Sequence, residues 1–436
     1  MVRTLRVAFV ISFTLLLDGL HAQVPLNIIR GRGKDMLAAV RKHVEKNYFD
    51  PTYGGVDMKA AFEKAERQMA DAQSAGHTFG IIAQALTTLN DSHTFFIPPS
   101  RASTVRYGWQ LAMIGDRCFI TSVKPGSDAE QRGMAPGDEV LSMQGFRPDR
   151  NILWKMKYMY YVLQPQAGLR FELRTPAGEI RQVEAAASIK QGKLVLDLTG
   201  REGDDYYEML REAQAEGKLR EHIYYNIGKE LMIYKMPTFS VQTDLIDRVI
   251  GKVRDYPNLI IDLRGNGGGA VSTLERLAGY LLPRDAVIAE RKGRKEEKPM
   301  KAARVAKPYE GKLAILIDSE SASASELLAR AVQIEGRGKV YGDRSAGSVR
   351  QSRQHEEQMG ADTVILYSVS VTNADIFMKD GKPLEHVGVQ PDELILPTPA
   401  DMAAHRDPVL SKAAASFGIN LSPDDAGKMF PVKWRN

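Results

Sequence analysis

A serine lies among small residues at the start of a predicted helix, an arrangement that suits nucleophilic catalysis. The apolar run Leu313–Ile317 predicts a buried strand, the turn SASASE follows it, and residues 326–334 continue with helical spacing. At such a helix start, backbone N–H groups and the positive end of the helix dipole could stabilise a developing oxyanion. The same serine could instead be an ordinary N-cap, so this stretch alone leaves both interpretations open.

A glycine-rich turn, GNGGG at residues 265–269, is a second feature that could take part in chemistry. It ends the apolar run LIIDL and precedes a helical pattern. The string lacks the Gly-Lys-Ser/Thr of a phosphate-binding loop and the spacing of a dinucleotide-binding fingerprint. Glycine lets a substrate lie close to the backbone and leaves N–H groups free, which favours oxyanion binding over phosphate binding. A turn without any role stays open.

Histidines in polar turns are candidates for the base that such a serine needs. Of the eight histidines in the chain, His93, His355 and His386 lie near recognisable motifs. A histidine near its free pKa can accept the proton of a serine and then donate it to a leaving group. His93 could also be a helix-end residue that binds free carbonyls.

The N-terminus predicts a secretory signal peptide over residues 1–22. Arg3 and Arg6 precede an apolar run from Val7 to Leu17, and cleavage is expected after Ala22. The run is too short to span a bilayer core of about 30 Å. We therefore expect a secreted or periplasmic protein with no stable membrane span after signal cleavage, and an uncleaved signal anchor is the alternative.

The rest of the 436 residues is long enough for two to three domains and divides by its pattern. Helical spacing predicts an N-terminal helical domain over residues 23–100, and short alternating strands predict a β-rich domain over residues 101–187. Residues 188–229 form a connector with a polar helical candidate. Residues 230–436 alternate buried strands with helices, which predicts an α/β core with parallel strands and a C-terminal extension.

Charge and cysteine content argue against several other classes. The formal charge of +5 becomes +4 without residues 1–22, because Arg3, Arg6 and Asp18 are removed. The densest basic stretch, residues 291–301, is interleaved with glutamates, so nucleic-acid binding is not expected. The single cysteine, Cys118, predicts a buried strand residue. No metal and no cofactor is expected.

The segment FITSVKPGSDAEQRGMAPGDEVLSMQG resembles a PDZ domain. The residues that fill the places of that pattern are Gly126, Ser127, Ala129, Gly133, Gly137, Asp138 and Gly145. PDZ domains bind a peptide as an added strand, with its terminal carboxylate in a nest of backbone N–H groups. The loop YGWQL corresponds to that nest, although Gln110 stands where many members have a second glycine. The resemblance therefore implies these substrate-binding residues: Gly108, Trp109, Gln110 and Leu111.

Four stretches, LIIDLRGNGGG, LAILIDSESASASE, VYGDRSAG and PLEHVGVQPDELI, together resemble the core of the C-terminal-processing and tricorn-core serine peptidases. The match covers roughly residues 230–396, and the preceding domains agree with it. The resemblance implies a crotonase- and ClpP-like spiral α/β core with Ser323 as the nucleophile. It also implies an oxyanion hole from the N–H groups of Ala324 and of Gly268 or Gly269. Two further residues, Thr238 and Phe239, would line the substrate cleft.

The base of the processing-peptidase branch is missing from this sequence. That branch has a lysine in the turn after the nucleophile, and Ser348 occupies the position here. Lys339 lies inside the preceding strand, and Arg350 stays protonated, so neither can replace that lysine as a base.

The tricorn-like branch offers another solution, because its base is a histidine directly after a serine. The turn DSHT supplies this pair as Ser92 and His93. Glu385 in PLEHVGVQPD would orient the imidazole, partly through Ser92, by the general logic of a catalytic triad. His386, next to Glu385, is the alternative base.

These expectations combine into a serine endopeptidase that acts on peptide or protein substrates and recognises peptides through a PDZ domain. Homo-oligomerisation stays open. Two other functions also stay open: a catalytically degenerate PDZ-containing binding or scaffold protein, and an esterase or amidase for small substrates.

Overall fold

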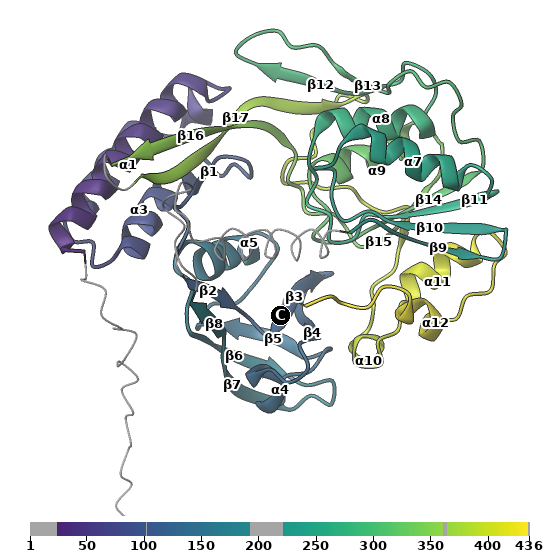
Figure 1. The fold of residues 1–436 in the computed structure, drawn as a ribbon, viewed down its shortest axis with the longest axis horizontal. Coiled ribbons are helices and arrows are strands. Elements are labelled where there is room, and N and C mark those ends of the chain that lie inside the picture. Colours follow the sequence, from purple (N-terminus) through teal and green to yellow (C-terminus); the bar gives the residue numbers. More distant parts are fainter. Residues whose placement is uncertain (1–23, 102, 192–220, 361–363, 435–436) are drawn as a thin grey trace, which may run out of the picture.

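The computed structural model describes residues 24–101, 103–191, 221–360 and 364–434. The expected signal peptide and most of the connector, with its helical candidate, lie outside these ranges. Figure 1 shows the N-terminal helices at one end, the α/β core at the other and the β-rich domain below them.

Six strands form the central sheet of the α/β core, in the order β18-β15-β14-β11-β10-β9. Neighbouring strands are parallel, except that the edge strand β9 is antiparallel to β10. The middle strands are almost fully buried, because helices cover both faces of the sheet. The strands are β9 (Ile223–Ile227), β10 (Leu231–Lys235), β11 (Asn258–Asp262), β14 (Lys312–Ile317), β15 (Lys339–Gly342) and β18 (Glu393–Leu394).

The helices of the core pack on this sheet in two layers. One hydrophobic cluster joins α7, α8 and α9 to one face, and another joins α11 and α12 to the opposite face. Their bounds are α7 (Thr243–Val253), α8 (Val271–Leu281), α9 (Ala324–Ile334), α10 (Pro399–Ala403), α11 (Pro408–Ala415) and α12 (Pro423–Lys428). The predicted α/β core with parallel strands is confirmed.

A second sheet connects the core to the N-terminal helices, and the sequence reasoning did not foresee it. Its long strands β16 and β17 leave the core and run toward α1 (Figure 1). The hydrophobic cluster of the N-terminal helices includes Tyr367, Val369 and Val371 of β17. The strands are β1 (Phe95–Ile97), β12 (Val287–Gly293), β13 (Met300–Lys301), β16 (Arg350–Met359) and β17 (Ile365–Met378).

The predicted helical region is present as α1 (Leu26–Asn47), α2 (Met58–Met69) and α3 (Ala75–Thr87), with the short turn η1 (Tyr53–Gly55). Strand β1 follows two residues after His93 and pairs with β17, so that Phe96 lies opposite Val369. The turn that carries His93 is therefore fixed by a strand from the other end of the chain.

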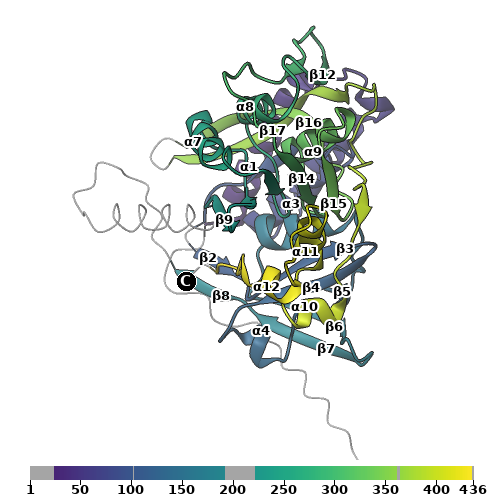
Figure 2. The ribbon, with the colours of Figure 1, turned by 90° about the vertical axis from the view of Figure 1, so that its right-hand side faces the viewer.

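The β-rich domain contains a five-stranded antiparallel sheet in the order β3-β4-β5-β6-β7 and a separate pair, β2 and β8. Cys118 is buried in β4, as predicted. Figure 2 shows α10 and α12 on the side of the core that faces this domain. The elements are β2 (Ser103–Arg106), β3 (Trp109–Ile114), β4 (Arg117–Val123), α4 (Asp128–Gln131), β5 (Glu139–Met143), α5 (Leu153–Lys157), η2 (Tyr158–Leu163), β6 (Gly168–Arg174), β7 (Ile180–Ala186) and β8 (Ser188–Gln191).

The PDZ assignment and the domain boundaries stay predictions. The β-rich domain touches the core directly after strand β15, since Arg150 donates to the Asp343 carboxylate at 2.6 Å. The Asp343 carboxylate also accepts the N–H of Gly115 at 2.9 Å. One buried carboxylate thus binds two segments of the β-rich domain.

Candidate active site

Ser323 lies in a sharp turn between strand β14 and helix α9. Its backbone has φ 54° and ψ −118°, whereas an ordinary N-cap residue is extended. A serine with positive φ at a strand-to-helix junction is a strained arrangement of the kind that exposes a nucleophile. Its side chain is half-buried. Ser323 is the N-cap residue of α9 and its N–H donates to Glu326 Oε2 at 3.0 Å, but its positive φ differs from that of a simple cap.

The glycine-rich turn lies against this serine because β11 and β14 are adjacent and parallel, so the segments after both strands meet at one edge. The Asn266 carbonyl accepts the N–H of Ala322 and the hydroxyl of Ser325, each at 2.9 Å. A Cβ at Gly268 would lie 2.7 Å from Cβ of Ser323, and Gly268 has φ 94°. Glycine is therefore required for this close approach.

The free backbone donors near Ser323 are those of Gly269 and Ala324. The N–H of Gly268 donates to the Asn266 side-chain oxygen at 2.8 Å, so it is already used. The N–H groups of Gly269 and Ala324 bind no other group among the described residues. Of the two glycines predicted from the sequence, Gly269 is thus the better candidate for the oxyanion donor. Gly268, which has no side chain, allows the close approach of the glycine-rich turn to Ser323.

Ser92, His93 and Glu385 form a continuous hydrogen-bonded chain. The Ser92 hydroxyl lies 2.7 Å from Nδ1 of His93 and 2.9 Å from Oε2 of Glu385. An ionised carboxylate can only accept, so the single hydroxyl proton goes to Glu385 and Ser92 accepts the proton of Nδ1. Nε2 of His93 then keeps its lone pair, as a general base requires.

Asp91 fixes the turn in which this histidine lies. Its Oδ1 accepts the N–H of His93 at 2.8 Å, the N–H of Thr94 at 3.0 Å and the Thr372 hydroxyl at 2.7 Å. Its side chain is buried. Asp91 is therefore a structural residue of this turn.

Arg350 lies between Asp91 and Glu385. Its Nη1 donates to Asp91 Oδ2 at 2.6 Å, and its Nε is 3.6 Å from Glu385 Oε1. Burial lowers the pKa of His93, while the charges of Glu385 and Asp91 raise this pKa and the charge of Arg350 lowers it. Arg350, which cannot be a base itself, thus helps to set the protonation of the candidate base.

A backbone turn links the two halves of the site. The N–H of Ser323 donates to the Ser348 carbonyl at 2.9 Å, and the N–H of Val349 donates to Glu385 Oε2 at 2.7 Å. No hydrogen bond joins the Ser323 hydroxyl to the His93 ring in the part of the chain that the structure describes. The candidate nucleophile and the group that holds the candidate base are therefore connected through the Ser348–Val349 backbone.

Glu326, in the first turn of helix α9, binds the segment 345–348 that contains Ser348. Its two oxygens accept from the Ser345 hydroxyl at 2.6 Å and from three backbone N–H groups at 2.8 to 3.0 Å. Burial raises the pKa of Glu326 to about 7, although these four donors favour the ionised form. The three N–H groups belong to Ser323, Gly347 and Ser348.

Three other predicted site residues lie beside this cluster, and each makes contacts of its own. Nε2 of His386 donates to the Asn90 carbonyl at 2.8 Å, although the ring is next to Glu385. Phe239 is fully buried, so only its backbone can face a cleft. The Thr238 hydroxyl is 3.3 Å from the Gly268 carbonyl, beside the glycine-rich turn.

The YGWQL loop belongs to the β-rich domain. Trp109 and Leu111 are buried in its hydrophobic core, and the Trp109 indole donates to the Tyr161 hydroxyl at 3.1 Å. Gln110 is exposed, and a Cβ at Gly108 would lie 2.5 Å from Cβ of Ser127. Of the four predicted residues, only Gln110 therefore presents an exposed side chain.

Sequence reasoning overlooked the roles of Arg350 and Glu326. The Ser-x-x-Glu spacing of Ser323 and Glu326 is a capping-box signal and could have indicated the contact with Ser323. Nothing local to Arg350 indicates that it reaches Asp91, because 259 positions separate the two residues.

The described ranges show neither a metal-ligand cluster nor a membrane-spanning helix. They contain no group of three or more His, Cys, Asp or Glu side chains that could hold a metal ion. None of their helices has the length and apolar character needed to cross a membrane.

Parts of this chain are similar in sequence to known peptidases. The model of peptidase family S41 matches residues 230–395. The tail-specific protease of Haemophilus influenzae is 26% identical over 280 residues, which cover 60% of this chain and 38% of that protein. Carboxyl-terminal-processing peptidase 2 of Arabidopsis thaliana, a chloroplastic protein, is 23% identical over 366 residues, 80% of this chain and 66% of that protein. The chain thus spans less than two thirds of the length of either relative.

Among solved structures, mature CPAF complexed with lactacystin aligns over 90% of this chain and 97% of its own, with a TM-score of 0.63 at 13% identity. At that identity the likeness shows the fold alone. The aligned 90% of the chain extends beyond the matched family segment, which confirms the predicted mixed α/β fold, while the PDZ assignment of the β-rich domain stays a prediction.

Proposed function

We propose that this chain, whose residues 230–395 match the model of peptidase family S41, is a serine endopeptidase in which Ser323 is the nucleophile and His93 the general base. The observation that carries the proposal is the chain of hydrogen bonds from Glu385 through Ser92 to Nδ1 of His93. It favours the tautomer whose Nε2 can accept a proton. No lysine is needed for this step.

In the proposed reaction the Ser323 hydroxyl gives its proton to Nε2 of His93 while its oxygen attacks the peptide carbonyl. The N–H groups of Gly269 and Ala324 stabilise the oxyanion. His93 then donates the proton to the leaving amine, which departs and leaves an acyl-enzyme. Water, deprotonated by His93, hydrolyses the ester and restores the serine. Glu385 stabilises the charged imidazole through Ser92.

We further propose that the substrates are peptides or proteins and that the β-rich domain binds their C-termini. The resemblance of residues 101–187 to a PDZ domain supports this, as do the relatives named for tail-specific and carboxyl-terminal processing. Thr238, beside the glycine-rich turn, is a candidate cleft residue. A secreted or periplasmic setting is proposed from the signal-like residues 1–22.

Labelling by a fluorophosphonate probe and cleavage of a peptide library test the nucleophile and the base together. We expect the wild type to be labelled and active, Ser323→Ala to lose both properties, and His93→Ala to lose activity. Full activity of either variant would disprove the mechanism. Loss in His386→Ala with normal activity in His93→Ala would transfer the role of base to His386.

The same measurements separate the alternatives. A wild-type protein that is neither labelled nor active, yet binds peptides, would be a degenerate binding protein. Hydrolysis of small esters without any peptide cleavage would indicate an esterase or amidase.

A further inference from the structure

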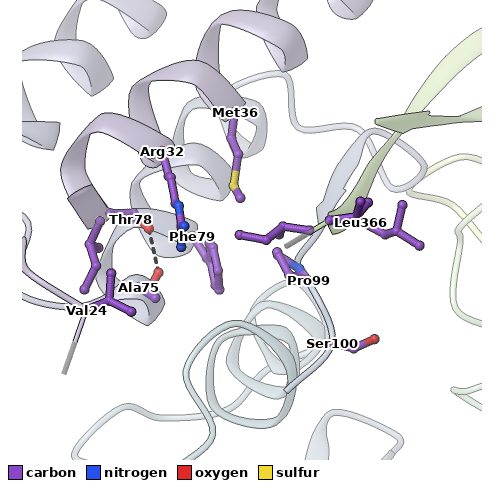
Figure 3. A pocket seen from close by; sticks show the side chains of 13 residues that line it. Val24, Arg32, Met36, Ala75, Thr78, Phe79, Pro99, Ser100 and Leu366 are labelled. Atoms are coloured by element: carbon purple, nitrogen blue, oxygen red, sulfur yellow. Dashed lines mark hydrogen bonds between the residues drawn. The ribbon is translucent and has the colours of Figure 1, made fainter. Parts of the chain in front are cut away.

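An apolar groove lies where helices α1 and α3 meet the start of strand β17. Its volume is about 460 Å³, within the range of about 300 to 1,000 Å³ that is typical of small-molecule pockets. Figure 3 shows Met36 and Arg32 pointing into it from α1, with Phe79, Pro99 and Leu366 around them. No residue of the candidate active site lines it, so it is a separate feature.

The mouth of the groove is unusually apolar for a protein surface. Leu366, Val364 and Val24 line it and are 66%, 46% and 45% exposed. Exposed apolar side chains that occur singly are normal, whereas a group of them around an open groove indicates a ligand-binding or partner-binding surface.

Arg32 is the one charged side chain among the described residues that line the groove. It makes no hydrogen bond and no ion pair with any described residue. The Thr78 hydroxyl, also in the lining, donates its single proton to the Ala75 carbonyl at 2.7 Å, so this side chain has no free donor (Figure 3). The groove therefore offers a long apolar wall and a single unpaired cation.

We infer that this groove binds a single-chain amphiphile with an anionic head, of which a long-chain fatty acid is the simplest case. The hydrocarbon chain would lie against Met36, Phe79 and Leu366, and its carboxylate would pair with the Arg32 guanidinium. An apolar chain needs no hydrogen-bond partners, and the lining offers almost none.

A peptide fits the same lining poorly. Each buried peptide unit brings an N–H and a C=O that need partners, and unpaired buried amides are costly. The Thr78 proton is already used, which leaves Arg32 and the exposed Ser100 as the side-chain donors of the lining. Charge complementarity with Arg32 selects an anion over a neutral lipid.

Fluorescence titration with palmitate that carries an anthroyloxy fluorophore tests the inference on the full chain and on the chain that begins at Gln23. We expect saturable binding by both, displacement by unlabelled palmitate and weaker displacement by the neutral hexadecanol. Ser323→Ala should bind equally well, so the result does not depend on the proposed peptidase activity.

Two variants locate the site, each with a matched control. Arg32→Gln should weaken palmitate binding at least tenfold and remove the preference for palmitate over hexadecanol, while Lys34→Gln on the exposed side of α1 should not. Ala75→Trp, at an exposed lining position, should fill the groove and abolish binding, and Ala38→Trp should leave it unchanged.

Three results would overturn the inference. Equal affinity for palmitate in the wild type, Arg32→Gln and Ala75→Trp would place any binding elsewhere. Binding by the chain from Gln23 but not by the full chain would assign the groove to the N-terminal segment. A dimer that Ala75→Trp dissociates, with no palmitate binding by the wild type, would make the groove an interface between two copies.

Discussion

Ser323 and Ser348 are joined by a backbone hydrogen bond of 2.9 Å, in which the N–H of Ser323 donates to the carbonyl of Ser348. Ser348 occupies the position at which the C-terminal-processing peptidases that this sequence resembles carry a lysine. Here its backbone rather than its side chain supports the site, because the next N–H, that of Val349, binds Glu385. The turn thus connects the proposed nucleophile to Glu385, the carboxylate proposed to orient His93.

Arg350 should affect the pH dependence of catalysis. Its charge lowers the pKa of His93, which acts as a base only when neutral, so removal of the charge should raise that pKa. The acid limb of kcat/KM should therefore move to higher pH in Arg350→Gln. Arg350→Lys keeps the charge and should keep the limb. A Gln variant with an unshifted limb would contradict this, provided that circular dichroism shows it to be folded.

Glu326 should be essential for the geometry around Ser323. A glutamine there turns one acceptor oxygen into a donor that faces N–H groups, and each unsatisfied buried group costs about 1 to 3 kcal/mol. We expect Glu326→Gln to lower kcat at least about tenfold and to lower the melting temperature, which kinetics and calorimetry can measure. Glu310→Gln, at an exposed position, is the matched control. Equal kcat in both variants would refute the role.

The glycines of GNGGG should differ sharply in their tolerance to alanine. A Cβ at Gly269 would lie 2.3 Å from the Ser240 nitrogen, and Gly269 has φ 144°. At Gly267 a Cβ meets nothing within 4 Å. Gly269→Ala should therefore reduce kcat/KM more than about tenfold, since backbone strain of about 1 to 3 kcal/mol must be relieved at the oxyanion donor. Gly267→Ala should stay near the wild type, and similar losses in both would count against the assignment.

Ser92 should act as a positioning residue for His93. Without its hydroxyl, Nδ1 loses its acceptor and Glu385 loses a donor, so the reactive tautomer is no longer favoured. We expect Ser92→Ala to lower kcat by about 10 to 100-fold with little change in KM. Ser92→Thr keeps the hydroxyl and should recover part of the loss. A change confined to KM would point to substrate binding instead.

Local sequence patterns were sufficient to predict strands and helices of the core. The apolar run Leu313–Ile317 and the helical spacing after SASASE predicted β14 and α9, because burial between two helical layers imposes a recognisable pattern. The strand and helix around GNGGG were predicted in the same way. The long strands β16 and β17 were missed, although they attach the N-terminal helices to the core.

The same distinction between local sequence and tertiary contacts applies to the candidate active site. The sequence determined which residues are available: Ser323 at a helix start, a serine–histidine pair, free glycine N–H groups and no lysine after the nucleophile. It could not decide their distances, because Ser92 and Glu385 are 293 positions apart and meet only when β1 pairs with β17 and the Ser348–Val349 turn binds both halves. Tertiary packing alone also placed Arg350 between two carboxylates, left Gly269 rather than Gly268 with a free N–H, and opened the groove beside Arg32. Spacing along a chain reports local hydrogen bonds and burial, whereas contacts between distant segments depend on how the sheets assemble.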